Sequence, residues 1–322
     1  MVKEIGGYFE LELSHKSSFP HSEGICLNSG RNALEYILRS ISPIRRLWIP
    51  YFTCEVILEP LHKLQIPYSF YSINEKLELK DTIQLASNEY LLATNYLGIK
   101  DSYIRTLAGI YKEQLIIDNA QAYFCPSIKG IKTIYSPRKF VGVPDGGIAM
   151  GVDTSKVGSL SVDCSYGRCS HLLKRYDLGA SGGYEDFHTN SHTLANQPMR
   201  IMSNLTKALL SNVDYSSVKE KRLNNFKYLH SNLSDINKLD ISSVDYFSCP
   251  MVYPYYTENS VLRRRLIENK IFIATYWPNV SNWCLDSSIE FKLTNNLLAI
   301  PVDQRYSLED MYIILNKIKN GF

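Results

Sequence analysis

The chain has 322 residues, of which 45% are hydrophobic and 21% are charged, and its formal net charge is +3. This composition is sufficient for a sizeable core and excludes extensive disorder. So small a net charge gives no argument for a nucleic-acid partner, and no stretch reaches the roughly 18 apolar residues that a membrane span needs.

Seven cysteines are scattered along the chain: Cys26, Cys54, Cys125, Cys164, Cys169, Cys249 and Cys284. An odd number without paired spacing indicates reduced thiols and a cytoplasmic protein. The first residues, MVKEIGGYFELEL, lack the apolar core of a signal peptide. Cys164 and Cys169 lie close to His171, but their spacing fits no standard zinc pattern, and we expect no metal site.

The first predicted helix follows a short lead-in, residues 1–27, which contains one alternating segment at residues 8–13. The helix begins just after Asn28-Ser29-Gly30. A helix N-terminus offers unpaired backbone N–H groups and a positive dipole, so this turn is a candidate phosphate site. Ser29 can equally be a simple N-cap, which explains the serine and explains Gly30 less well. Apolar residues then repeat at helical spacing: Ala33, Leu34, Ile37, Leu38 and Ile41.

Strands then alternate with helices, which indicates a mostly parallel sheet covered by helices. We predict strands at residues 47–49, 66–73 and 90–95, and helices at residues 51–65 and 102–113. Right-handed crossovers place the carboxyl ends of parallel strands at one edge of such a sheet.

Residues 115–147 carry the candidate chemistry. An apolar run, residues 115–117, ends in Asp118, and a second predicted strand, residues 133–135, leads into Ser136-Pro137-Arg138-Lys139. A carboxylate and an amine at neighbouring strand ends suit pyridoxal phosphate: the lysine forms the Schiff base, and the aspartate pairs with the pyridinium nitrogen. The alternative is that neither residue is functional, because an aspartate after a strand is often a helix N-cap and a lone lysine is usually a surface residue.

The rest of the chain is predicted as follows. Residues 148–152 form a further strand, and residues 155–200 form a long irregular stretch of the kind that is usually functional or mobile. Residues 202–233 are helical. We divide the chain into a large α/β domain, residues 1–205, and a small α+β domain, residues 206–322, with strands near 247–251 and 271–274 and a closing helix from Leu308. Arg263-Arg264-Arg265 is interpreted as the solvated face of a helix.

Several motifs, in order along the chain, resemble those of the sugar aminotransferases of the DegT/StrS type, which have the fold type I architecture of pyridoxal phosphate enzymes. The segments that carry the resemblance are SGRNAL, IPYFTCEVILEPL, NYLG, IIDNAQA, YSPRKFVGVPDGG, YWP and LLAIPVDQRYSLEDMYIIL.

The resemblance implies a role for each candidate site residue. Lys139 would hold the cofactor as a Schiff base and later move the proton, and Asp118 would pair with the pyridinium nitrogen. Gln121 would lie against the cofactor ring or its hydroxyl. In the turn that starts at Ser29, Gly30 and Arg31 would offer backbone N–H groups to the phosphate. Ser136 would offer its hydroxyl.

This chain also departs from the family pattern. Where the family places an aromatic residue to stack on the cofactor ring, this chain has Cys54, so Tyr51 or Phe52 is expected to stack instead. Arg31 replaces a threonine, and Asp145 replaces the glutamate before the Gly146-Gly147 pair. The family's G-x-N-x-R motif has no clear match: Tyr184, Asn196 and Arg200 lie in that region but do not align securely with it.

The resemblance implies an aminotransferase that moves an amino group from glutamate to a nucleotide-linked keto-sugar for surface-polysaccharide synthesis. It also implies a homodimer with sites at the interface. Arg138, Arg168 and Arg200 are the candidates for the donor carboxylate. Alternatives are a sugar dehydratase relative, which would have a histidine in place of Lys139, a regulatory homologue, and a nucleotide-binding protein that uses Ser29-Gly30 for phosphate but lacks a GxGxxG or GxxxxGK[ST] motif.

Overall fold

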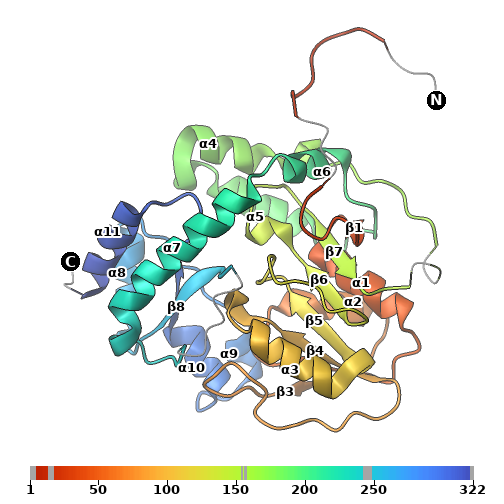
Figure 1. The fold of residues 1–322 in the computed structure, drawn as a ribbon, viewed down its shortest axis with the longest axis horizontal. Coiled ribbons are helices and arrows are strands. Elements are labelled where there is room, and N and C mark those ends of the chain that lie inside the picture. Colours follow the sequence, from red (N-terminus) through yellow and green to blue (C-terminus); the bar gives the residue numbers. More distant parts are fainter. Residues whose placement is uncertain (1–4, 14–17, 154, 156–157, 242–248, 320–322) are drawn as a thin grey trace.

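The structure is a computed structural model, and it describes residues 5–13, 18–153, 155, 158–241 and 249–319. Its centre is a seven-stranded sheet with the strand order β1-β7-β6-β5-β4-β2-β3 (Figure 1). The strands of this sheet are β1 (Ile25–Leu27), β2 (Arg46–Pro50), β3 (Tyr68–Tyr71), β4 (Glu89–Thr94), β5 (Leu115–Asn119), β6 (Lys132–Tyr135) and β7 (Gly147–Met150).

Most neighbouring strands of this sheet are parallel. The pairs β5–β6, β4–β5, β2–β4 and β2–β3 are parallel, whereas β7 pairs antiparallel with β1 and with β6. The register places Asp118 beside Thr94 of β4 and Ile134 of β6, so the carboxyl ends of the parallel strands meet at one edge. The predicted architecture, a mostly parallel seven-stranded sheet covered by helices, is confirmed.

Helices α1 (Gly30–Ser40), α2 (Leu58–Lys63) and α3 (Asp101–Tyr111) complete this layer structure. Successive residues of a strand point to opposite faces of a sheet. Ile116 accordingly packs in the core cluster that contains the apolar face of α1, and Ile117 packs in the cluster that contains Ile104 of α3. Both faces of β5 are therefore buried, which explains its continuous apolar run.

The predicted helix over residues 51–65 is too long. Only α2 is α-helical there, preceded by a 3-10 turn at Glu55–Ile57. The backbone N–H of Tyr51 instead donates to the carbonyl of Tyr71 at 2.9 Å, which continues the pairing of β2 with β3. The aromatic ring of Phe52 is buried against Tyr96 and Trp277. These tertiary contacts override the local helical pattern.

The prediction of an irregular stretch over residues 155–200 is wrong for its second half. The helices α4 (Ser170–Gly182) and α5 (Tyr184–Thr193) form a hairpin there. Within α4, His171 is the one buried residue, and within α5 it is Asn190. Helices that bury so little have no apolar stripe, so periodicity in the sequence does not reveal them.

The C-terminal part is built from α6 (Asn204–Ser211), α7 (Tyr215–Leu233), α8 (Leu262–Glu268), α9 (Val280–Trp283), α10 (Ile289–Asn296), α11 (Leu308–Lys319) and the strands β8 (Val252–Tyr256) and β9 (Leu297–Pro301). Strands β8 and β9 pair antiparallel. The side-chain amide of Asn225 in α7 donates to the carbonyls of Val302, Asp303 and Tyr306, which fastens this helix to the end of β9. None of the described helices is long and apolar enough to cross a membrane.

The remaining predictions for this part have mixed outcomes. The closing helix from Leu308 and a helix around Arg263-Arg264-Arg265 are confirmed. The predicted strand at residues 271–274 is wrong: Ala274 makes only a single bridge, to Ala299. Of the predicted strand at 247–251, residues 247 and 248 lie outside the described residues, and β8 begins after it. The division between residues 205 and 206 stays a prediction and falls within α6.

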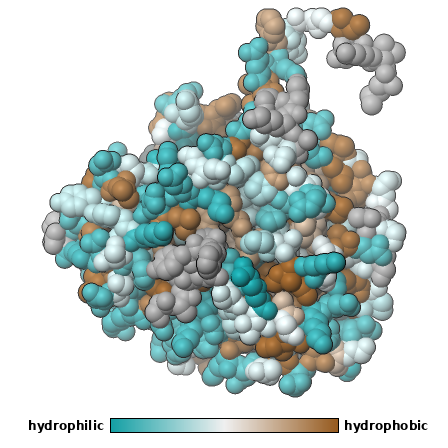
Figure 2. Space-filling model, viewed as in Figure 1, coloured by the Kyte–Doolittle hydropathy of each residue, from teal (hydrophilic) through white to brown (hydrophobic). Residues whose placement is uncertain are grey.

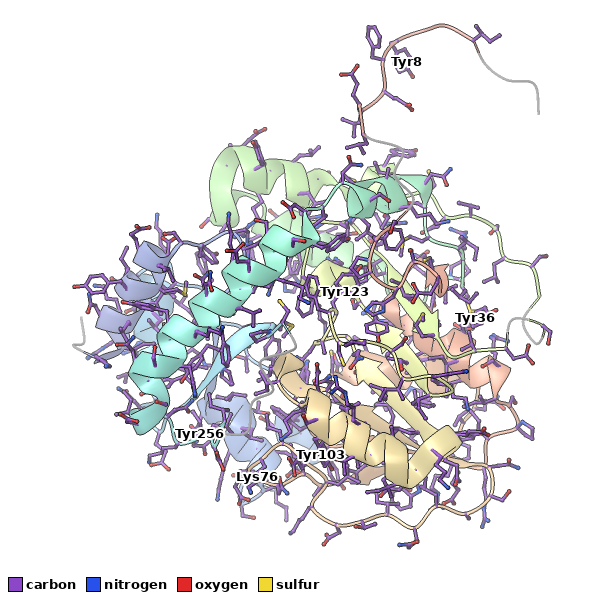
Figure 3. The ribbon with its side chains drawn as sticks, in the orientation of Figure 1. Tyr8, Tyr36, Lys76, Tyr103, Tyr123 and Tyr256 are labelled. Atoms are coloured by element: carbon purple, nitrogen blue, oxygen red, sulfur yellow. The ribbon has the colours of Figure 1, made fainter. Side chains whose placement is uncertain are left out.

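Residues 5–13 extend away from the body of the protein (Figures 1 and 2). The predicted alternating segment, residues 8–13, forms no strand here. The side chain of Tyr8 is 99% exposed and projects from this segment, unlike Tyr123, whose ring is buried in the body (Figure 3).

A close backbone contact fixes how β7 meets the start of α1. An ideal Cβ on Gly147 would lie 2.2 Å from the carbonyl oxygen of Ser29 and 2.6 Å from the nitrogen of Gly30. The preceding Gly146 has a φ of +117° and donates its N–H to the carbonyl of Asn28 at 3.1 Å. Only glycine fits at position 147 because even a methyl group would displace the first turn of α1.

We expect the Gly147→Ala variant to lower the free energy of unfolding by about 2–3 kcal/mol, because its Cβ overlaps backbone atoms that have no room to move. Gly109→Ala is the matched control: Gly109 lies in α3, and a Cβ there meets no atom within 4 Å. That substitution should stabilise the protein by about 0.5–1 kcal/mol. Urea unfolding measures both changes, and equal effects of the two variants would contradict the contact.

Candidate functional site

Asp118 and Lys139 follow neighbouring strands of the sheet. Asp118 lies in β5, and Lys139 lies in the 3-10 turn Pro137–Lys139 after β6. The backbone N–H of Ala120 donates to the carboxylate of Asp118 at 2.9 Å. Burial raises the pKa of Asp118, and the charge of Lys139 acts in the opposite direction, as does the bond from Ala120. The positive charge of Lys139 therefore favours the ionised carboxylate, but burial of Asp118 outweighs it.

The start of α1 lies against the turn that carries Ser136. An ideal Cβ on Gly30 would lie 3.8 Å from the Cβ of Ser136 and 3.9 Å from its Oγ. The hydroxyl of Ser29 accepts the N–H of Asn32 at 3.1 Å, so Ser29 is the N-cap of α1. The N-terminus of α1 and the Ser136 hydroxyl thus face the same space, and Gly30 leaves that space free of a side chain. This arrangement accommodates an anion.

Two guanidinium groups flank this helix start. The Nε of Arg31 lies 3.3 Å from a carboxylate oxygen of Glu59 without a hydrogen bond, and the Nε of Arg138 is likewise buried without a hydrogen-bond partner among the described residues. Burial lowers the pKa of Arg138 to about 10, assisted by the charge of Arg31 and opposed by Asp145. Glu59 compensates the charge of Arg31, so the positive charge of Arg138 is the one that favours an anion in this region.

Gln121 follows β5 and lies near Asp118 in the chain, with its side chain buried. The Oε1 of Gln121 accepts the backbone N–H of Leu97 at 3.0 Å, which orients the amide. The Nε2 of the same amide is buried and has no hydrogen-bond partner among the described residues. A buried donor without a partner costs free energy, so this amide is suited to a ligand acceptor.

The contacts of Tyr51 and Phe52 do not favour the predicted stacking role. The ring of Tyr51 stacks on Phe70, with centroids 4.6 Å apart, and Phe52 is only 1% exposed. Both rings already have aromatic partners within the chain. Which residue covers the cofactor ring stays a prediction.

A buried ion-pair network stands behind the Gly146-Gly147 turn. Arg168 donates to the carboxylate of Asp145 at 2.6 and 3.0 Å and to Asp163 at 2.5 Å, and Arg200 donates to Asp163 at 3.1 Å. The hydroxyl of Thr206 donates to the other oxygen of Asp145 at 2.5 Å. Of the three arginines predicted for the donor carboxylate, Arg168 and Arg200 are thus already paired.

Arg138 is held by the α4–α5 hairpin. It donates to the hydroxyl of Ser191 at 3.1 Å, and its guanidinium carbon lies 5.0 Å from the ring centroid of Phe187. The side-chain amide of Asn190 donates to the carbonyl of Pro144 at 2.8 Å. The hairpin therefore supports the Lys139 turn. Nothing in the sequence signalled this contact, because residues 155–200 carry no clear periodicity.

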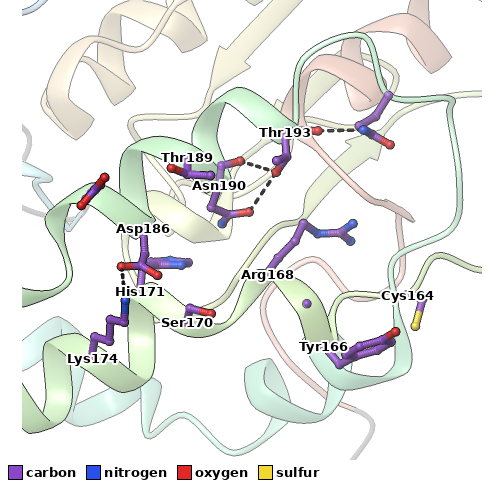
Figure 4. A pocket seen from close by; sticks show the side chains of 13 residues that line it. Cys164, Tyr166, Arg168, Ser170, His171, Lys174, Asp186, Thr189, Asn190 and Thr193 are labelled. Carbon is purple, nitrogen blue, oxygen red and sulfur yellow. Dashed lines mark hydrogen bonds and ion pairs between the residues drawn. The ribbon is translucent and has the colours of Figure 1, made fainter.

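A cavity of about 740 Å³ lies within the hairpin region (Figure 4). Its lining includes Arg168, His171 and Asn190, and neither Asp118 nor Lys139 takes part. Neither of these two side chains lines the cavity, so its volume does not locate the candidate chemistry. We place the candidate site at the strand ends instead.

No protein-family model and no curated protein matches the sequence. Solved structures do match in fold. DesV from S. venezuelae, in complex with a ketimine intermediate, is 14% identical, with 92% of this chain and 84% of that chain covered and a TM-score of 0.65. NtdA from Bacillus subtilis, with bound cofactor PMP, is 15% identical, with 92% and 72% covered and a TM-score of 0.64.

A DegT DnrJ EryC1 StrS aminotransferase from Brucella abortus is likewise similar. It is 15% identical, with 92% of this chain and 85% of that chain covered and a TM-score of 0.61. The chain therefore has the fold of the DegT/StrS-type sugar aminotransferases over nearly its whole length. The resemblance predicted from the sequence motifs is confirmed at this level.

We expect Arg168→Met to lower the free energy of unfolding at pH 7 by about 3–5 kcal/mol, because it leaves buried carboxylates without their cation. Burial opposes the ionisation of Asp163, but its hydrogen bonds to the Cys164 backbone and to Arg200, with its pairing to Arg168, lower its pKa overall. The stabilisation is therefore complete above the unfolded carboxyl pKa of about 4 and is lost as the pH falls below it.

The difference in unfolding free energy between wild type and Arg168→Met should accordingly narrow as the pH falls below about 4, as measured by denaturant unfolding at each pH. Arg264→Met is the control, since the side chain of Arg264 is 72% exposed and pairs with the exposed Glu268 at 3.7 Å. That change should stay below about 1 kcal/mol. If the loss of unfolding free energy in Arg168→Met is the same at every pH, the electrostatic role of the network is contradicted.

Proposed function

We propose that the chain is a pyridoxal-phosphate-dependent aminotransferase. It moves an amino group from glutamate to a nucleotide-linked keto-sugar, and the product enters surface-polysaccharide synthesis. The protein acts in the cytoplasm as a homodimer. Its seven cysteines are all free thiols, which agrees with a reducing compartment.

One observation carries this proposal: Asp118 lies near the end of β5, and Lys139 lies in the turn that follows the adjacent parallel strand β6, at the same edge of the sheet. Close by, Gly30 at the start of α1 faces Ser136 on the Lys139 turn. These three features suit pyridoxal phosphate: the acid pairs with the ring nitrogen, the amine bonds to the aldehyde carbon, and the anion site holds the phosphate. The fold shared with the aminotransferases supports the same conclusion.

The residues present fit pyridoxal phosphate. The phosphate would be held by the backbone N–H groups at the start of α1, by the Ser136 hydroxyl, and by the positive charge of Arg31 and Arg138. The unpartnered Nε2 of Gln121 would donate to the ring hydroxyl. Asp118, whose pKa is raised by burial, would gain a positive partner in the ring nitrogen.

When bound, the cofactor supplies an electron-withdrawing ring that makes the Cα proton of the amino donor acidic. Asp118 would hold a proton on the ring nitrogen, because an ionised carboxylate favours the charged form of a partner beside it. The Nζ of Lys139 would take the proton from Cα and return it one carbon away. Lys139 is exposed and ends a short turn, so its long side chain is free to move between these positions.

A lysine at position 139 disfavours the dehydratase alternative, for which a histidine is expected. The phosphate-only alternative does not account for Asp118 and Gln121. The regulatory alternative is separated from the enzyme by experiment, since a regulatory homologue would bind the cofactor and transfer no amino group.

We expect purified protein to bind pyridoxal phosphate covalently and to develop visible absorbance. After borohydride reduction, peptide mapping should find the cofactor on Lys139. Lys139→Ala should lose covalent attachment, because its side chain lacks the amine. Lys129→Ala is the control, since Lys129 is exposed in the loop before β6. A reducible attachment that persists in Lys139→Ala would refute the assignment.

We expect Asp118→Asn to keep the cofactor bound but to slow amino transfer from glutamate by on the order of 100-fold or more, because the neutral amide no longer stabilises a protonated ring nitrogen. The measurement is the single-turnover rate of conversion of the bound cofactor by glutamate. Asp81→Asn, at an exposed position, should leave this rate unchanged. Unchanged turnover in Asp118→Asn would remove the electronic role, and no conversion by any amino acid in wild type would favour the regulatory homologue.

A further inference from the structure

Arg222 is a buried cation in α7, and it reaches the Lys139 turn from the C-terminal part of the chain. Its side chain is almost fully buried, at 2% relative exposure. The Nε donates to Oε1 of Gln304 at 2.9 Å, one Nη donates to the carbonyl of Met251 at 3.1 Å, and the other donates to the carbonyl of Phe140 at 3.1 Å. Each of these described acceptors is neutral.

The carbonyl of Phe140, the residue after Lys139, accepts a second bond. The amide Nε2 of Gln304 donates to it at 2.9 Å, and the guanidinium carbon of Arg222 lies 4.7 Å from the Phe140 ring centroid. Arg222 and Gln304 thus bind one another and converge on a single carbonyl. We call this arrangement the Phe140 clamp.

The same guanidinium is linked to the Gln121 side of the site. Met251, whose carbonyl it binds, donates its own N–H to the carbonyl of Leu97 at 2.8 Å, and the N–H of Leu97 donates to Gln121. A continuous set of hydrogen bonds therefore runs from the Lys139 turn through Arg222 to Gln121. Leu97 has a φ of +58°, a conformation that such contacts must hold in place.

Burial lowers the pKa of Arg222, and the negative charge of Asp303 opposes this effect only in part. A buried cation whose hydrogen bonds all go to neutral groups is unfavourable for stability compared with an apolar side chain. Its five-donor fork is, however, suited to fixing several carbonyls at once. Fixing the backbone beside a reacting side chain is a use that accounts for such a group.

We propose that Arg222 is a positioning residue for Lys139, and that Gln304 assists it at the same carbonyl. The clamp sets the direction in which the Lys139 turn presents its amine, and it couples that turn to the Gln121 amide. This inference rests on the proposed function for the role of Lys139. The geometric part, that the clamp holds the turn, is independent of any cofactor.

The first test is hydrogen exchange of the protein without cofactor. The N–H groups of Phe140 and Val141 both donate to the carbonyl of Pro137, at 2.8 and 3.0 Å, so they report opening of the turn. Arg222→Met should speed their exchange by about tenfold or more, and Gln304→Ala should do so to a smaller extent. If Arg222→Met does not fold, Gln304→Ala carries the test.

The second test separates attachment from binding. In Arg222→Met, the rate at which pyridoxal phosphate becomes borohydride-fixed on Lys139 should fall about tenfold or more. The affinity for pyridoxine phosphate, which lacks the aldehyde, should stay within about twofold because the phosphate site is unchanged.

Asn225→Ala is the matched control for both tests. Asn225 lies about one turn further along α7 and is equally buried, and the hydrogen bonds of its side-chain amide to described residues go to the carbonyls that follow β9 instead of to Phe140. It should lower global stability and leave the turn amides and the attachment rate unchanged. Wild-type exchange in Arg222→Met, or the same effect in Asn225→Ala, would overturn the proposal. Failure of wild type to attach the cofactor would instead defeat the proposed function, and the exchange experiment would still decide on the clamp.

Discussion

The contact of Gly147 with the Ser29–Gly30 backbone is the constraint on which the candidate site depends. It brings the one antiparallel strand of the large sheet against the first turn of α1, closer than any side chain at position 147 would permit. With that turn fixed, Gly30 faces Ser136, and the space that we propose for the phosphate lies beside the turn that carries Lys139. This one backbone contact thus helps to position three segments that are far apart in sequence: the start of α1, the Lys139 turn and β7.

Charge placement around this contact follows two patterns. Behind it, Asp145 and Asp163 are matched by Arg168 and Arg200, so that the network is internally compensated. In front of it, Arg31 is paired with Glu59, whereas the buried Nε of Arg138 has no hydrogen-bond partner among the described residues. The paired charges behind the turn stabilise the structure, whereas the free donor of Arg138 near the helix start is suited to an anion.

The sequence predicted the parts of this protein that local patterns govern. A continuous apolar run identified β5, a short run of strand-forming residues identified β6, and Asp118, Ser136 and Lys139 were placed at the ends of these strands. The pattern did not reveal α4 and α5, whose exposed helices have no apolar stripe. Nor did it reveal the Arg222 contact, since one arginine in a charged helix resembles a solvated one, and only the tertiary structure distinguishes them.

The central claim is that the acid, the amine and the helix start surround one cofactor. An experimental structure of the protein loaded with pyridoxal phosphate tests it most directly. The account predicts the phosphate between the N-terminus of α1 and Ser136, with the ring nitrogen within hydrogen-bond distance of Asp118. A phosphate bound elsewhere, or a ring nitrogen that faces away from Asp118, would contradict it.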